Sequence, residues 1–151
     1  MAFKFRFESI LNLKIRMEDM KKSEFKSISE KLEEEKEKLK TLTQEREMQY
    51  EKMKIKQEKA ISKQEMITFN NYINVLKKKI NLQKQVVLEV SEKLEQVRQE
   101  LVKVSQEKKM FETLKEKKKE EYLKEYYKKE QEVVDNLTSF KFGRGEEDEK
   151  N

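Results

Sequence analysis

No residue that readily interrupts a helix occurs in the first 142 positions of this chain, because proline is absent and the only glycines are Gly143 and Gly145. Long helices are therefore expected. Hydrophobic residues make up 34% of the chain and charged residues 44%, whereas compact domains are roughly 45–50% apolar. Such a chain cannot bury a globular core of ordinary size, so we expect one elongated helical unit.

Apolar residues between positions 66 and 111 recur at alternating spacings of three and four. Twelve of the fourteen positions in this seam are apolar, and a sustained repeat of 3.5 residues predicts a left-handed coiled coil. The seam consists of Met66, Phe69, Ile73, Leu76, Ile80, Gln83, Val87, Val90, Leu94, Val97, Leu101, Val104, Lys108 and Phe111.

The first half of the chain carries a weaker seam, from Phe25 to Ala60, in which polar residues such as Glu35 and Arg46 occupy several positions. A long helix with so poor an apolar face needs a richer partner, because most helical stability comes from packing. Residues 66–111 can supply that partner within the same chain. We therefore predict an all-α fold in which two long helices form an antiparallel coiled-coil hairpin, and we expect it to be a monomer by itself.

The chain must then reverse near residue 60. Ser62 and Glu65 have the spacing of a capping box, and Ile61 and Met66 occupy the positions of a hydrophobic staple. These signals place helix one at about 8–58, the bend at about 58–62 and helix two at about 63–137, so that paired positions sum to roughly 120. A single coiled-coil domain over 1–142 and a disordered acidic tail over 143–151 are expected.

Several functional classes are disfavoured by composition. Histidine and cysteine, the usual bases, nucleophiles and metal ligands, are both absent, and no Gly-rich phosphate loop occurs. We therefore expect no enzyme, no metal site and no cofactor. No apolar run approaches the roughly 18 residues that span a bilayer. Positive and negative residues alternate, so nucleic acid is not an expected partner, although the lysines at 77–79 and 115–119 keep that class open.

Residues 66–88 contain no acid and carry a second apolar stripe beside the seam. A helix with two stripes can pack on two neighbours, so this stripe predicts a partner-binding surface. A thickened core near the bend or a homodimer contact would explain the same pattern. The stripe consists of Tyr72, Val75, Lys79, Leu82 and Val86.

Two segments resemble the FliJ family of the bacterial flagellar type III export apparatus: the opening "FKFRFESILNLK" and the midpoint "SKQEMITFNNYINVLKKKI". The resemblance implies an antiparallel coiled coil similar to the rotary stalk of F-type ATPases. It also implies a non-enzymatic stalk and adaptor that binds the hexameric export ATPase and the cytoplasmic part of the export gate, coupling energy to the export of flagellar subunits. Export chaperones are further implied partners. The implied location is cytoplasmic, peripheral to the inner membrane at the flagellar base.

The resemblance also implies contact residues. The family's gate-binding aromatic and leucine fall on Tyr72 and Leu76, where better-known members have phenylalanine in place of the tyrosine. We expect Phe69, Val75 and Lys79 to extend this gate surface. For the export ATPase we expect a weaker surface at the terminal end of the hairpin, formed by Phe3, Phe5, Phe7, Lys117 and Lys118. The alternative function is a generic structural spacer or a homodimerisation protein.

Overall fold

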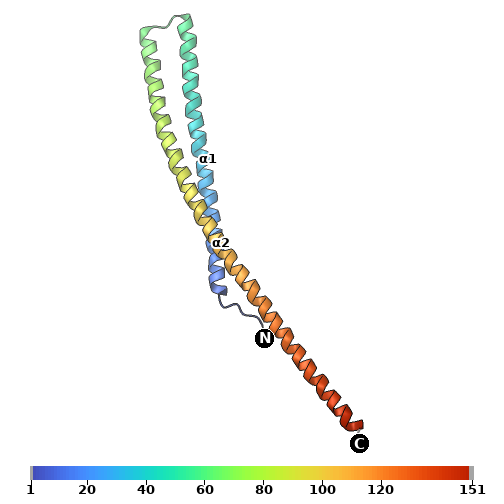
Figure 1. Ribbon diagram of the computed structural model, residues 1–151. Helices are drawn as coiled ribbons and strands as arrows, with labels where there is room; N and C mark the ends of the chain where they lie inside the picture. The colour runs from blue at the N-terminus through green and yellow to red at the C-terminus, as the bar shows by residue number, and fades with distance from the viewer. Residues whose placement is uncertain (1, 150–151) are drawn as a thin grey trace. The chain divides into compact units, whose positions relative to one another are not determined.

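The computed structural model describes residues 2–149, with side chains up to residue 144. Two helices account for nearly all of them: α1 (Glu8–Lys59) and α2 (Lys63–Glu149) (Figure 1). The predicted all-α helical hairpin is confirmed. The contacts divide the chain into two units, Glu18–Lys103 and Met1–Met17 with Val104–Asn151, and each is described separately.

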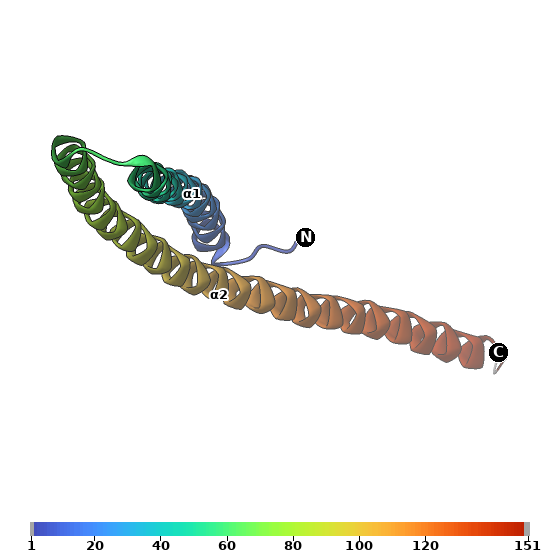
Figure 2. The same ribbon diagram turned by 90° about the horizontal axis from the view of Figure 1, so that it is seen from above.

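In the unit Glu18–Lys103, α1 and α2 run in opposite directions from the bend, as Figures 1 and 2 show. The Tyr72 hydroxyl donates to Glu45 at 3.3 Å, and the Lys21 ammonium donates to Glu100 at 2.5 Å. The residue numbers of such pairs sum to about 120. The register predicted from a reversal near residue 60 is therefore observed.

The core of this unit follows the predicted seam. One cluster consists of Ile28 and Leu32 of α1 with Val90 and Val97 of α2. Nearer the bend, α2 buries three further seam residues at 1–3% exposure. These are Ile73, Leu76 and Ile80.

A polar layer interrupts the seam between these two parts of the core. The Gln83 amide donates to the Glu35 carboxylate at 2.5 Å and to the Glu35 carbonyl oxygen at 2.9 Å, and Lys38 pairs with the same carboxylate at 3.2 Å. Glu35 is 9% exposed. A buried polar group is tolerated when it is hydrogen-bonded, and a shifted register would leave this carboxylate without its partner. The layer thus favours one register over its neighbours.

Acidification should weaken the hairpin through this layer. The Gln83 amide, and next Lys38, hold the pKa of Glu35 below its ordinary value of 4.5. A carboxyl group with a lowered folded-state pKa stabilises the fold above its unfolded-state pKa, and that stabilisation is lost as the pH falls through the folded-state value. We expect the wild-type chain to unfold at a higher urea midpoint than Glu35→Gln near pH 7. The difference between the two midpoints should shrink below about pH 4.5. A difference that stays constant down to about pH 3 would contradict this role.

The bend consists of residues 60–62. Ala60 has φ of 85°, the left-handed conformation with which helices commonly end, although glycine usually occupies it. Ser62 then caps α2, because its hydroxyl accepts the Glu65 amide proton at 3.2 Å and its carbonyl accepts from Met66 at 3.1 Å. The spacing of Ser62 and Glu65 had indicated this cap.

In the second unit, the start of α1 packs against α2 from Val104 onward. Leu11 and Val104 are buried, and Lys115 pairs with Glu8 at 2.9 Å. The residues before α1 continue the contact, because the Phe3 ring lies 5.6 Å from that of Tyr122.

The C-terminal part of α2 differs from the expectation. We expected helix two to end near residue 137 and a disordered tail over 143–151, but α2 continues to Glu149, and residues 150 and 151 lie outside the described residues. An exposed glycine costs a helix only about 1 kcal/mol, and proline, which costs about 3 kcal/mol, is absent. The glutamate and lysine around Gly143 and Gly145 are good helix formers, so the glycines do not end α2.

Candidate partner-binding surfaces

The acid-free stretch of α2 presents an exposed apolar stripe near the bend. Tyr72 is 41% exposed, Val75 47% and Leu82 70%, and Lys79 lies exposed among them. We call these four residues the bend stripe. Val86, the fifth member predicted from the sequence, instead packs against the core cluster. The stripe is therefore a solvent-facing surface and not a thickened core.

Leu76 lies on the other face of α2. It is 3% exposed, between the equally buried Ile73 and Ile80. Four residues separate it from Tyr72, and such pairs are neighbours along a helix, but only Tyr72 reaches solvent. The structure therefore places Leu76 in the core, where it supports the stripe from beneath.

A hollow of about 330 Å³ adjoins the bend stripe, and Phe69 and Tyr72 form its apolar wall. The Lys56 ammonium lies 5.7 Å from the centre of the Phe69 ring. Lys56 also pairs with Glu65 at 3.8 Å across the bend. Such a hollow can accept one apolar side chain of a partner, with charged groups at its rim. The remaining residues that line it are Gln49, Gln64 and Thr68.

The hydroxyl of Tyr72 explains why tyrosine suits this position. It donates to Glu45 of α1, a contact that phenylalanine cannot make. Partial desolvation, and then the Glu45 charge, raise the pKa of Tyr72 above 10.0, so the hydroxyl stays protonated at neutral pH and remains a donor. The ring is thereby oriented while much of its surface stays exposed.

The surface around the bend stripe is positively charged. Lys77, Lys78 and Lys79 are all exposed, and residues 66–88 contain no acid to neutralise them. Complementary charge mainly sets the orientation and rate of encounter with a partner. The surface is therefore suited to a partner segment with apolar anchors and an acidic flank.

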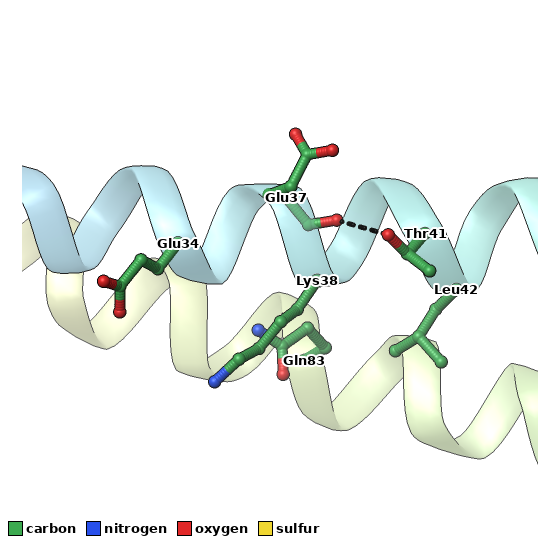
Figure 3. Close-up of a pocket in the computed structure, with 6 residues that line it drawn as sticks. All are labelled: Glu34, Glu37, Lys38, Thr41, Leu42 and Gln83. Carbon is green, nitrogen blue, oxygen red and sulfur yellow. Dashed lines mark hydrogen bonds between the residues drawn. The ribbon is translucent and has the colours of Figure 1, made fainter.

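A second hollow, of about 620 Å³, lies between α1 and α2 beside the polar layer (Figure 3). Thr41 donates to the carbonyl oxygen of Glu37 at 3.0 Å, and Leu42 supplies the apolar wall. Sequence reasoning did not identify this hollow. In the sequence, the hollow is indicated only by the polar residues that interrupt the two seams beside it, Glu35 and Gln83.

The terminal surface expected for the export ATPase is only partly assembled. Phe3, Phe5 and Phe7 are half-buried, and the Phe7 ring lies 6.2 Å from that of Phe111. Phe3 and Phe5 line a hollow of about 460 Å³ that contains Lys115. The aromatic residues thus pack on their own chain and leave their edges accessible.

The two lysines expected beside these phenylalanines lie elsewhere on α2. Lys118 pairs with Glu121 at 3.4 Å. Lys117 lines a separate hollow of about 660 Å³ with Met110, Phe111 and Leu114. Two basic residues share the hollow with Phe3 and Phe5: Lys4 and Lys115. The sequence pattern had indicated Lys115 only as part of a lysine-rich stretch.

Within the described residues, no cluster of acidic side chains has the arrangement of a metal site. No helix in that same part of the chain is long and apolar enough to cross a membrane.

Comparison with known proteins identifies one family. The family described as "Flagellar FliJ protein" matches the chain over residues 3–147. No curated protein matches, and no solved structure does. The matched range covers both surfaces described above.

Proposed function

The chain belongs to the FliJ family, and from this premise we propose that it is a non-enzymatic stalk and adaptor of flagellar protein export. The family has a role in flagellar export. In the proposed role the hairpin joins the hexameric export ATPase to the cytoplasmic part of the export gate, and so helps couple energy to export. Its proposed location is the cytoplasmic face of the inner membrane at the flagellar base, with export chaperones as further partners.

One observation carries the proposal: the bend stripe leaves an aromatic ring and two large aliphatic side chains in solvent, within a stretch that contains no acid. Aromatic residues that are held rigid and exposed are typical interface anchors. The bend stripe is therefore the proposed gate surface, with Tyr72, Val75 and Lys79 as direct contacts and Phe69 at its edge. Leu76 acts through the core in this proposal.

The terminal phenylalanines are the proposed ATPase surface. Phe3 and Phe5 line a hollow together with Lys4, Lys115 and Glu8, and Glu8 pairs with Lys115. They offer an apolar patch whose rim has a net positive charge. Lys117 and Lys118 belong to the same proposal as exposed charges further along α2. Because the gate and ATPase surfaces involve different residues, one chain could engage both partners.

A binding assay and an activity assay test this function. Purified full-length chain should retain the cytoplasmic domain of the gate protein in a pulldown, and it should stimulate the ATP hydrolysis of the export ATPase.

Replacing Phe3 and Phe5 with alanine should lower ATPase stimulation several-fold while gate binding is unchanged, because the two surfaces consist of different residues. Circular dichroism of the variant controls for loss of helix. If the chain fails to bind the gate domain, or fails to stimulate the ATPase, the adaptor role is refuted and a structural spacer is favoured.

A further inference from the structure

The C-terminal part of α2 carries a second exposed apolar stripe, which neither proposed contact uses. Its members recur at spacings of three and four, as in a coiled-coil seam, and Glu130 occupies the one polar position in it. The exposed fractions of its apolar members range from 37% to 60%. We call it the terminal stripe. It consists of Leu123, Tyr126, Glu130, Val133, Leu137 and Phe140.

This stripe begins where the observed contacts with the start of the chain end. The ring contact of Phe3 with Tyr122 is the one farthest along α2, among the described residues. Beyond it, α2 continues to Glu149. A helix of this length draws most of its stability from packing an apolar face. An apolar seam along an otherwise uncovered helix therefore calls for a second helix.

The seam pattern predicts a chain that is a monomer by itself. From the uncovered stripe we propose instead that the terminal stripe binds the same stripe of a second copy of this chain, with the two helices antiparallel. The spacing is symmetric about its centre, so that Leu123 of one copy lies opposite Phe140 of the other, and Tyr126 opposite Leu137. Glu130 then lies opposite Val133. A parallel pair in register would instead place the two Glu130 carboxylates against each other, which is unfavourable.

Charge favours a second copy over a strongly charged partner. Residues 123–142 contain four lysines (124, 128, 129 and 141) and four acids (125, 130, 132 and 135), so the segment has no net charge. Two copies therefore meet without net repulsion.

The polar residue within the stripe has an internal partner. The Tyr126 hydroxyl donates to Glu130, one turn away, and this bond raises the pKa of Tyr126. A carboxylate that enters an interface is costly unless it is hydrogen-bonded. Tyr126 therefore allows Glu130 to be covered.

The surface that the terminal stripe offers to a second copy is modest in area. Tyr127 at 61% and Val134 at 53% exposure widen the stripe. An aromatic side chain buries roughly 150–250 Å² when it is covered from a fully exposed state, and the apolar side chains of this surface are only 37–61% exposed, so the interface is small. A small interface lies at the lower end of the range for specific interfaces, so a reversible dimer is expected.

Sedimentation equilibrium of the full chain tests the proposal. The average mass should rise with concentration from 18.5 kDa toward twice that value. Leu137→Glu should weaken association at least tenfold, because it places a charge in the seam. Leu88→Glu is the matched control, since Leu88 is 50% exposed and lies on neither the bend stripe nor the terminal stripe. A chain that stays monomeric at all concentrations, or an association that Leu137→Glu leaves intact, would overturn the proposal.

Disulfide trapping tests the orientation, since the chain has no cysteine of its own. A mixture of Tyr126→Cys and Leu137→Cys copies should form the mixed disulfide at least ten times faster than Leu137→Cys forms a disulfide with itself. Faster self-coupling of Leu137→Cys would show a parallel pair and overturn the antiparallel arrangement. Both readouts concern self-association alone, so they are independent of the proposed export function.

Discussion

Leu76→Ala is expected to destabilise the hairpin by about 2–5 kcal/mol, the usual cost of truncating a fully buried leucine. Leu76 is 3% exposed and lies between Ile73 and Ile80, so truncating its side chain leaves a cavity in the core. A two-helix core has few layers, and each neighbour can compensate only slightly. Urea unfolding followed by circular dichroism measures the loss.

The neighbouring residue provides the control for this prediction. Val75 is 47% exposed and lies on the solvent-facing side of α2, whereas Leu76 lies on the buried side. Val75→Ala should lower the free energy of unfolding by less than about 1 kcal/mol, as surface substitutions usually do. Equal losses for the two variants would mean that the two faces of α2 are packed alike.

Tyr72→Ala is expected to weaken binding of the export-gate cytoplasmic domain by about 30-fold or more, as the loss of an anchor at an interface centre often does. The ring is held by the bond to Glu45 and is 41% exposed, so it reaches a partner in a preset orientation. The midpoint of unfolding should change little. Isothermal titration calorimetry with the purified gate domain measures the affinity.

Two further variants sharpen the interpretation of that result. Tyr72→Phe removes the bond to Glu45 but keeps the ring, so it should retain most of the affinity. Val102→Ala controls for exposed valines on α2, because Val102 is 42% exposed but lies outside residues 66–88. If Tyr72→Ala binds as tightly as Val102→Ala, the bend stripe is not the gate surface.

The core could be predicted from sequence because a repeat of 3.5 residues leaves few alternatives. Ile73, Leu76 and Ile80 were seam positions, and all three are buried. The polar layer was visible only as two interruptions, since no sequence rule pairs Glu35 with Gln83 until the register is known. The bend could be located because the capping signal of Ser62 and Glu65 lies where the weak seam of the first half ends and the richer seam of residues 66–111 begins.

The candidate surface was harder to predict. The seam spacing placed Leu76 against α1, whereas the family resemblance implied that Leu76 contacts the gate together with Tyr72. The burial of Leu76 and the exposure of Tyr72 separate the two roles. Val86 shows the same ambiguity, because it shares the second stripe with Leu82 but packs on the core. The predicted end of α2, near residue 137, was wrong by about twelve residues, because glycine weakens a helix without necessarily ending it.

Hydrogen exchange of the full chain, alone and bound to the cytoplasmic domain of the export gate, tests the central claim most directly. Our account predicts new protection in the acid-free stretch at residues 66–82, around the bend stripe, with little change at residues 3–17. Protection confined to the terminal part of the hairpin, with residues 66–82 unchanged, would contradict it.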